Sequence, residues 1–240
     1  SRGACELTCG EGNLWPVPHG KHIVNNTLKA VSRNSFSFAY TRAKTETQSM
    51  LQSASLRFLD VLTKNRKYKE TKESLSSGAP VMISYNVEHA DLTLNLDTDE
   101  SYTLNIKEDV CKCAATSQPC QQEVDNSCSA RLQDGSCAAG TLDCRMGRVL
   151  QVDISSKTYF GSRHALETLS QLVVFDELKG TLVMPSSVTV EDEPAFAYRG
   201  LMLDTARHFL PVWMIKKTID AMSYTKMNRL HLHLTDTASW

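Results

Sequence analysis

The sequence has no excess of charge of either sign. Its 240 residues include 26 Lys and Arg against 27 Asp and Glu, which gives a formal net charge of −1. Proteins that bind nucleic acid without sequence preference carry a broad basic surface. The charge balance therefore argues against general nucleic-acid binding.

The sequence also lacks a long hydrophobic run. No uninterrupted apolar stretch approaches the roughly 20 residues that a membrane-spanning helix needs. The chain begins with Ser1 and shows no apolar signal core, so we expect that a leader was removed or never included. Because 41% of the residues are hydrophobic, we expect a globular chain of one large domain, or of one domain and part of another.

Cysteine, by contrast, is plentiful. The eight cysteines form an even number, which favours an oxidising compartment. Two stand near the start, and six fall in a polar stretch at about 109–147 that contains no histidine and lacks the paired C-x2-4-C spacing of zinc sites. We therefore predict disulfides rather than zinc and leave the pairing open. The cysteines are Cys5, Cys9, Cys111, Cys113, Cys120, Cys128, Cys137 and Cys144.

An N-glycosylation acceptor occurs at Asn25, because Asn25-Asn26-Thr27 has the N-x-T pattern. The pattern has meaning only in a secretory protein, and chance accounts for it equally well when it is taken alone. Together with the cysteines, it favours a secretory route, with an extracellular or lysosomal destination.

Hydrophobic periodicity predicts an α+β arrangement over the first 193 residues. A helix-period stripe runs from about 48 to 65, and a second helix follows Ser162, which we expect to be its N-cap. We predict that the polar stretch at 109–147 is a surface insertion held together by disulfides. Alternating patterns predict strands at 36–40, 81–87, 102–106, 149–154, 181–184 and 188–190.

An acidic, proline-ended connector at 191–194 marks the predicted domain boundary, which divides the chain into 1–193 and 194–240. Beyond it the apolar run 200–203 predicts a strand covered on both faces. Pro211 suits the first position of a helix, and residues 230–235 predict a second strand. Strand, helix and strand make a βαβ unit with parallel strands, and two strands cannot complete such a sheet.

Candidate functional residues follow the two predicted strands of this unit. Reactive side chains of parallel α/β sheets gather at the carboxyl ends of the strands. Arg207 offers a fork of donors for the hydroxyls or carboxylate of a polar ligand. An ion pair with Asp204 that merely ties the loop is an equally good interpretation. Asp236 is suited to orient an imidazole or a polar substrate group, or else to cap a helix.

Histidines supply a second candidate site. His231 and His233 alternate onto one face of the predicted strand, as two metal ligands would, but packed histidines are the more common outcome, and no nearby carboxylate–histidine set completes a site. Arg163 and His164 near a helix start are expected to be structural. The acidic turn region of Asp91, Asp97, Asp99 and Glu100 is expected to be solvated.

Three stretches resemble a known family. Residues 161–172 read GSRHALETLSQL and resemble the G-x-R-H-x-L-E-T-L-S-Q-L helix of the β-N-acetylhexosaminidases of glycoside hydrolase family 20. Residues 198–209 read YRGLMLDTARHF and resemble the family's Y-R-G-x-x-x-D-T-x-R-H-x stretch. Residues 220–236 are similar to its D-A-M-x-x-x-K-x-N-x-x-H-W-H-x-x-D run. The opening Leu14-Trp15-Pro16 is also similar to eukaryotic members, and the matches keep their order along most of the chain.

The resemblance implies a noncatalytic N-terminal domain followed by the first βαβ unit of an incomplete (β/α)8 barrel. It implies removal of terminal N-acetylglucosamine or N-acetylgalactosamine from glycans or chitin oligomers, by retaining hydrolysis in which the substrate's own acetamido oxygen attacks. By position, Arg207 corresponds to the arginine that binds sugar hydroxyls, and Asp236 to the aspartate that supports a catalytic-site histidine. No cofactor and no metal are implied, and a homodimer of the full-length protein is suggested.

The resemblance also predicts what the chain lacks. The family's Asp-Glu pair, in which Asp orients the acetamido group and Glu is the general acid, lies further along the barrel, and no matching segment occurs before Trp240. We therefore expect a fragment that is inactive alone. Leu232 replaces the usual tryptophan, and the Cys-rich stretch departs from common lysosomal members. The alternatives are a metal-dependent hydrolase that uses His231 and His233, and a noncatalytic glycan-binding relative.

Overall fold

The computed structural model describes residues 1–8, 13–64, 78–110 and 148–237, so most of the Cys-rich stretch lies outside the described residues. The chain forms two compact units. The first comprises residues 1–92 and 99–193, and the second comprises 93–98 and 194–240. Residues 93–98, which the sequence places with the first unit, belong to the second. One reason is that Arg229 Nη2 donates to the carbonyl of Leu94 at 3.4 Å.

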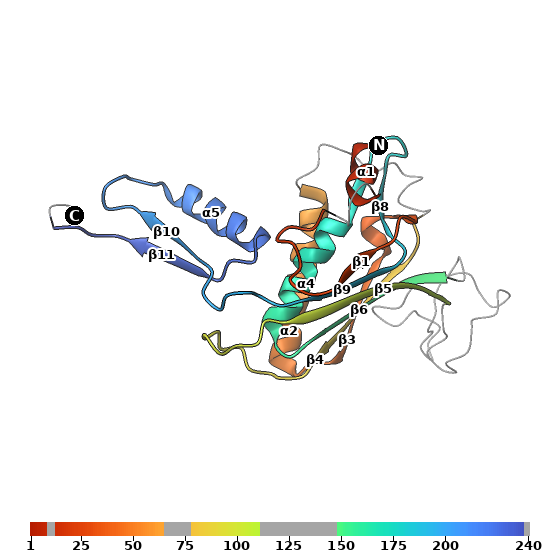
Figure 1. Ribbon diagram of the computed structural model, residues 1–240, viewed down its shortest axis with the longest axis horizontal. Coiled ribbons are helices and arrows are strands. Elements are labelled where there is room, and N and C mark those ends of the chain that lie inside the picture. Colours follow the sequence, from red (N-terminus) through yellow and green to blue (C-terminus); the bar gives the residue numbers. More distant parts are fainter. Residues whose placement is uncertain (9–12, 65–77, 111–147, 238–240) are drawn as a thin grey trace, which may run out of the picture. The chain divides into compact units, whose positions relative to one another are not determined.

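The first unit is built on a six-stranded mixed sheet (Figure 1). The three strands at one side are parallel, whereas the other three are antiparallel to their neighbours. The predicted strands 36–40 and 102–106 are longer in the structure. In spatial order the strands are β1 (His22–Val24), β9 (Val188–Asp192), β5 (Tyr102–Val110), β6 (Arg148–Ser156), β4 (Val81–Val87) and β3 (Phe36–Arg42).

A smaller antiparallel sheet lies in the same unit. It has the order β2 (Leu28–Val31), β8 (Thr181–Pro185) and β7 (Val174–Asp176). The short helix α1 (Arg2–Thr8) contacts β7 and β8, and the 3-10 turn η1 (Arg33–Ser35) connects β2 to β3. All five residues of β8 are buried, and the strand is paired on both edges.

Two helices, α2 (Thr45–Lys64) and α4 (Tyr159–Leu172), pack against each other, and α4 also contacts β4, β5 and β6. The helix-period stripe of α2 is buried as predicted: Leu51, Phe58 and Leu62 are at most 4% exposed. The strict alternation of buried residues along β4 directs every second side chain into the same core. Each fully buried aliphatic or aromatic side chain contributes about 1.5–3 kcal/mol relative to its exposed state.

Polar side chains of α4 are bonded to distant segments of the first unit. His164 Nε2 lies 2.7 Å from Glu100 Oε2, and Thr168 Oγ1 lies 2.6 Å from the hydroxyl of Tyr102. The carboxamide of Gln171 binds both backbone groups of Trp15, accepting from its N–H and donating to its carbonyl, each at 2.7 Å. The helix motif at 161–172 therefore fixes α4 to β5 and to the start of the chain.

Two expectations about this region are wrong. Glu100 is 5% exposed rather than solvated, because His164 reaches it from a segment 64 residues away. Ser162 is not the N-cap, since α4 begins at Tyr159 after the cap residue Thr158. Ser162 is buried inside the first turns, where its hydroxyl lies 2.8 Å from that of Ser156.

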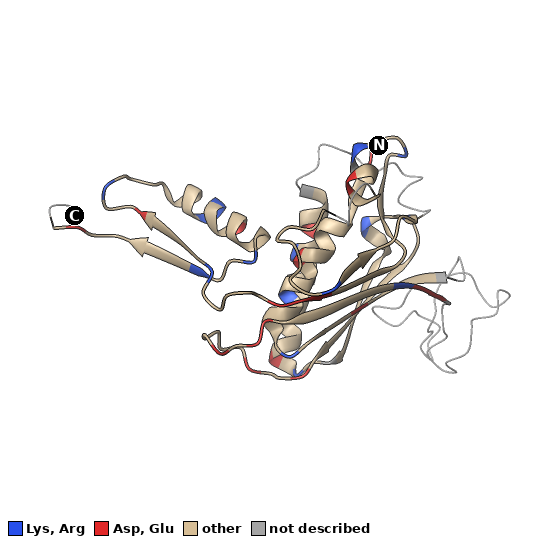
Figure 2. Cartoon of the chain, viewed as in Figure 1, with Lys and Arg blue, Asp and Glu red and all other residues tan. Residues whose placement is uncertain are grey.

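The second unit contains the strand–helix–strand arrangement that the sequence predicts. Strand β10 (Gly200–Asp204) is followed by α5 (Val212–Tyr224) and β11 (Arg229–His233), and the two strands pair in parallel. Pro211 is the N-cap of α5 rather than its first helical residue. Acidic and basic residues occur along both units (Figure 2).

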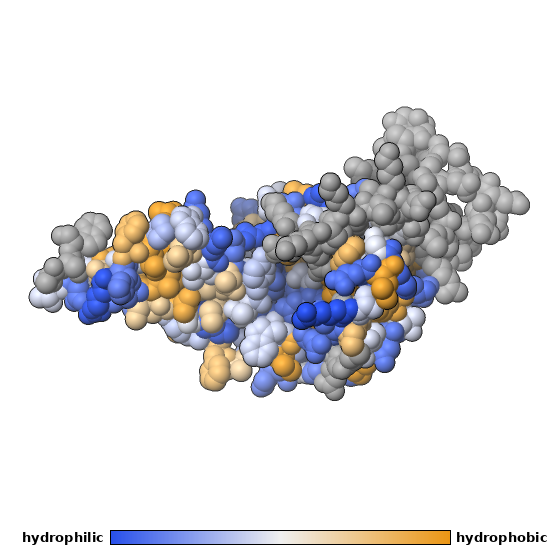
Figure 3. All heavy atoms as spheres, turned by 90° about the horizontal axis from the view of Figure 1, so that it is seen from above, coloured by the Kyte–Doolittle hydropathy of each residue, from blue (hydrophilic) through white to orange (hydrophobic). Residues whose placement is uncertain are grey.

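The expected burial of β10 on both faces is wrong for the part of the chain that the structure describes. Met202 in β10 is 56% exposed, and only Met222 of the apolar stripe on α5 is buried, while Val212 is 66% exposed. A single helix belongs to this unit within the described residues, so apolar side chains reach its surface (orange on the left of Figure 3).

Gly161 in α4 provides a test of the close approach between this helix and the segment before β5. A Cβ atom at Gly161 would lie 2.2 Å from the carbonyl oxygen of Ser101. Gly→Ala inside a helix normally stabilises it by about 1 kcal/mol, whereas overpacking costs about 1–3 kcal/mol. We expect Gly161→Ala to lower Tm by several degrees in thermal denaturation followed by circular dichroism. Ser53→Ala on the exposed face of α2 is the control and should not lower it, and an unchanged Tm for Gly161→Ala would contradict the contact.

Candidate functional site

The candidate site lies at the carboxyl ends of β10 and β11 in the second unit. The parallel register pairs Asp204 with His233, the last residues of the two strands. The loop after β10 is tied to the end of β11, because the backbone N–H groups of Thr205 and Ala206 donate to the carbonyl of His233 at 2.9 and 3.2 Å. The hydroxyl of Thr205 donates to the same oxygen at 3.1 Å. These bonds hold the loop after β10 against the end of β11.

Asp204 organises the loop that follows β10. Its Oδ1 accepts the backbone N–H groups of Ala206 and Arg207, both at 3.1 Å, and its Oδ2 accepts from Arg207 Nη1 at 2.6 Å. The hydrogen bond from the Arg207 side chain, followed by that from the Arg207 backbone, lowers the pKa of Asp204 below its usual value. Asp204 therefore stays ionised in mildly acidic solution.

Arg207 joins the two strand ends. Besides Asp204, its guanidinium forms an ion pair through Nη2 with Asp236 Oδ2. Asp236 Oδ1 in turn accepts the backbone N–H of Thr237 at 3.0 Å. The Arg207 side chain is nevertheless 63% exposed. The ion pair with Asp204 is thus present, but the exposed face of the guanidinium leaves donors for a ligand, so the two sequence interpretations are compatible.

The two histidines of β11 lie on one face of the β10–β11 pair. The register pairs His231 with Met202 and His233 with Asp204. His231 is exposed, whereas Nε2 of His233 is buried and has no hydrogen-bond partner within the described residues. No group of three or more His, Cys, Asp or Glu that could hold a metal ion occurs in the part of the chain that the structure describes. The sequence analysis named Asp204 only as an ion-pair partner of Arg207 that ties the loop, and the structure contains this ion pair.

The remaining predicted residues lie in the first unit. The carboxamide of Asn25 donates to Ser186 Oγ at 3.1 Å and accepts from the backbone N–H of Ser187 at 3.2 Å. The candidate glycosylation residue is therefore half-buried where the β1–β2 connection meets the β8–β9 connection. Cys5 is disulfide-bonded. The other seven cysteines lie outside the described residues.

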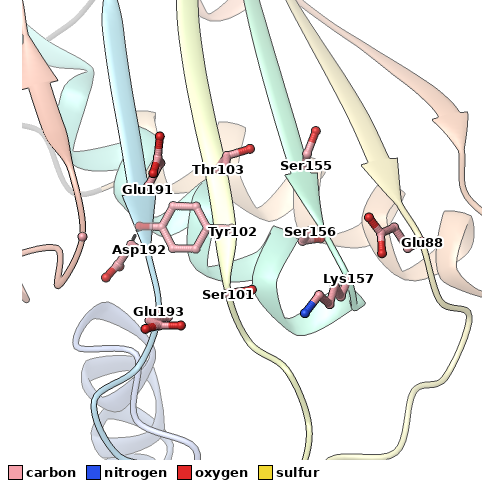
Figure 4. A pocket seen from close by; sticks show the side chains of 11 residues that line it. Glu88, Ser101, Tyr102, Thr103, Ser155, Ser156, Lys157, Glu191, Asp192 and Glu193 are labelled. Atoms are coloured by element: carbon pink, nitrogen blue, oxygen red, sulfur yellow. Dashed lines mark hydrogen bonds between the residues drawn. The ribbon is translucent and has the colours of Figure 1, made fainter.

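A separate open pocket of about 390 Å³ lies in the first unit, at one end of the main sheet (Figure 4). Four carboxylates, from Glu88, Glu191, Asp192 and Glu193, line it together with Lys157 and several hydroxyls. Asp192 is already bonded to the hydroxyl of Tyr102 at 2.9 Å and to the backbone N–H of His19 at 2.9 Å. The buried side-chain polar atoms without partners, within the described residues, are on Thr47 and His233, and neither lines this pocket.

Two family models match different parts of this chain. Residues 196–240 match the family model "Glycosyl hydrolase family 20, catalytic domain", and residues 14–120 match the model "beta-acetyl hexosaminidase like". The first match contains Arg207 and Asp236. Both descriptions place the chain among the glycoside hydrolases.

Individual relatives extend this result along the chain. A chitooligosaccharidolytic β-N-acetylglucosaminidase from Ostrinia furnacalis is 30% identical over 99% of this chain and 34% of its own length. A probable β-hexosaminidase from Drosophila melanogaster is 33% identical over 99% of this chain and 36% of its own length. The chain thus spans about a third of the length of these relatives.

A solved structure shows the same fold. The X-ray structure of a chitobiase from Flavobacterium johnsoniae superimposes with a TM-score of 0.59 at 24% identity, over 95% of this chain and 28% of that one. The chain belongs to glycoside hydrolase family 20, which confirms the resemblance found in the sequence. Its mixed α/β fold is shared with structures of that family.

The electrostatics of the site can be tested at Asp204. We expect Arg207→Ala to raise the pKa of Asp204 toward the ordinary range of an aspartate, because the largest cause of its lowering is removed. The stability that this ionised carboxylate contributes is present at neutral pH and is lost as the pH falls through its lowered pKa. Carboxyl ¹³C NMR titration measures the shift. The Asp99 carboxyl in the first unit should titrate unchanged, and an unshifted Asp204 would contradict the assigned cause.

Proposed function

We propose that this chain is the N-terminal domain, residues 1–193, and the opening βαβ unit of the (β/α)8 catalytic domain, from residue 194, of an exo-β-N-acetylhexosaminidase. The observation that carries the proposal is the meeting of Arg207 and Asp236 at the carboxyl ends of two parallel strands. In (β/α)8 barrels the active site lies at this end of the strands. The names of the relatives support terminal N-acetylhexosamine as the substrate.

Arg207 binds the sugar in this proposal. A guanidinium has five N–H donors in a planar fork, and the two ion pairs engage two of them. Contacts with the described residues thus leave three donors for hydroxyl groups of the terminal sugar. Asp204 and Asp236 hold the fork in place, so little rotamer entropy remains to be lost when the sugar binds.

Asp236 has a supporting role. Its carboxylate is half-buried and fixed by Arg207 and by the backbone of Thr237, which makes it suited to orient a neighbouring imidazole. The reaction is substrate-assisted: the acetamido oxygen attacks the anomeric carbon, an Asp orients that group, and a Glu protonates the leaving oxygen. We propose that this Asp-Glu pair is supplied by chain beyond residue 240.

We further propose a secretory route, with an extracellular or lysosomal destination. The disulfide at Cys5 supports it, because disulfides persist in oxidising compartments. None of the helices formed by the described residues is long and apolar enough to span a bilayer. Glycosylation of Asn25 and a homodimer of the full-length protein are further predictions.

The activity itself can be tested with a chromogenic aryl N-acetyl-β-glucosaminide. We expect the full-length protein that contains this chain to release the aryl group, and residues 1–240 alone to show no turnover. A general acid contributes about 10²–10⁴-fold, and its loss together with most of the barrel should leave nothing measurable. Turnover by residues 1–240, or full-length protein that binds N-acetylglucosamine without cleaving the glycoside, would contradict the proposal.

The role of Arg207 can be tested in the full-length protein with Arg207→Lys. Lysine keeps the positive charge but cannot bond two carboxylates and a sugar in one plane. We expect KM for the aryl glycoside to rise by about tenfold or more, since one charge-assisted bidentate contact is worth about 1.5–3 kcal/mol. The matched control is Lys217→Arg on the exposed side of α5, which should leave KM unchanged. Unaltered kcat and KM for Arg207→Lys would refute the role.

A further inference from the structure

Two connections between the sheets of the first unit are bonded to each other. The chain passes from β1 of the main sheet to β2 of the smaller sheet, and it returns from β8 to β9. The backbone N–H of Asn25 in the β1–β2 connection donates to the carbonyl of Ser187 at 3.0 Å. The backbone N–H of Ser186 in the β8–β9 connection donates to the carbonyl of Thr27 at 2.8 Å. The two connections therefore meet where the chain changes sheets.

The side chain of Asn25 completes this contact. Its Nδ2 donates to Ser186 Oγ at 3.1 Å, and its Oδ1 accepts from the backbone N–H of Ser187 at 3.2 Å. These two bonds and the two backbone bonds form the Asn25 clamp. Ser186 is only 7% exposed, whereas Asn26 and Thr27 are exposed. The N-x-T pattern thus reaches the surface, but the nitrogen that would carry a glycan is engaged with a buried partner.

The clamp depends on a segment that is made much later than Asn25. Asn25 and Ser186 are 161 residues apart in the sequence. Since a chain grows by about 5–20 residues per second, roughly 8–30 s pass between the synthesis of Asn25 and that of Ser186. Strand β9, the neighbour of β1 in the sheet, is made later still. During this interval the side chain of Asn25 has not yet met its partners in the folded protein.

We propose that Asn25 receives an N-linked glycan only in this interval, and that its carboxamide afterwards closes the clamp with the glycan attached. The inference rests on the proposed secretory route and adds when the residue is modified and what the modified side chain does in the folded protein.

The covalent step leaves the clamp intact. Nδ2 of Asn25 forms a bond to the anomeric carbon of the first sugar, while the bond from that carbon to a phosphate oxygen of a lipid-linked pyrophosphate oligosaccharide breaks. The lipid pyrophosphate leaves with the electron pair of the broken bond and takes up one amide proton. One N–H remains on Nδ2 and Oδ1 is unchanged, so the bonds to Ser186 and Ser187 still form.

The timing can be tested on full-length protein made without glycosylation in an oxidising bacterial host. Native protein, and the same protein reduced, alkylated and diluted from urea, are incubated with an oligosaccharyltransferase and a lipid-linked oligosaccharide. Mass spectrometry measures the occupancy of Asn25. We expect occupancy at least about tenfold lower in the native protein, because the hydrogen bonds of the clamp must open first.

Two variants control this comparison. Asp97→Thr gives the exposed Asn95 the N-x-T pattern, and Asn95 should be modified in native and unfolded protein alike. Ser186→Ala removes the acceptor of Asn25 Nδ2 and should raise the occupancy of Asn25 in the native protein. Ser53→Ala on the exposed face of α2 is its matched control and should leave the occupancy low.

The clamp is tested separately in secreted full-length protein. Asn25→Ala and Thr27→Ala both abolish the N-x-T pattern, but only Asn25→Ala also removes the two side-chain bonds of the clamp. We expect the Tm of the first unit to be about 2–6 °C lower in Asn25→Ala than in Thr27→Ala. This comparison does not depend on whether Ser186→Ala folds.

The outcomes separate the inference from the proposals on which it rests. Equal occupancy of Asn25 in native and unfolded protein, or an unoccupied Asn25 in the secreted wild type, would overturn the timing. Equal Tm values for Asn25→Ala and Thr27→Ala would overturn the clamp. Each of these results leaves the proposed enzyme function and the secretory route standing. Full-length protein that stays in the cytosol of a eukaryotic host when expressed with its own leader would contradict the secretory route, and with it the proposed time of modification.

Discussion

The parallel pairing of β10 with β11 is the constraint on which the candidate site depends. Because the two strands run in the same direction and in register, Asp204 and His233 end them side by side. The loop after β10 then bonds back to the end of β11, and Arg207 reaches Asp236 across the gap between the loops. A shift of one residue in this register would reverse the face on which Asp204 lies and would separate the charges.

The first unit shows how a specific sequence motif can be structural rather than catalytic. Three polar residues of α4 have partners outside the helix: His164 binds Glu100, Thr168 binds Tyr102, and Gln171 binds the backbone of Trp15. Buried polar groups are costly unless they are bonded, which accounts for the bond of the buried Thr168 to Tyr102 and of the buried Glu100 to His164. The motif at 161–172 and the opening Leu14-Trp15-Pro16 thus serve one task, which is to fix α4 against the sheet and the start of the chain.

Sequence patterns predicted elements well where local periodicity decides the structure. The bounds of β4, the helix period of α2 and the strand–helix–strand order after residue 194 are present as predicted. The patterns failed where a distant partner decides. Nothing near Glu100 in the sequence indicates that His164 will bury it. The start of α4 was missed for a local reason, because both Thr158 and Ser162 are residue types that favour an N-cap and the helix begins after the first of them. The site was found through residue types at strand ends, but the sharing of Arg207 between two carboxylates depends on the fold.

The central claim is that Arg207, held by Asp204 and Asp236, is the sugar-binding group of this unit. A crystal structure of the full-length protein with bound N-acetylglucosamine tests it most directly. The account predicts that the guanidinium of Arg207 donates to hydroxyl oxygens of the sugar while both ion pairs remain intact. A sugar bound without contact to Arg207, or an Arg207 that has left both carboxylates, would contradict it.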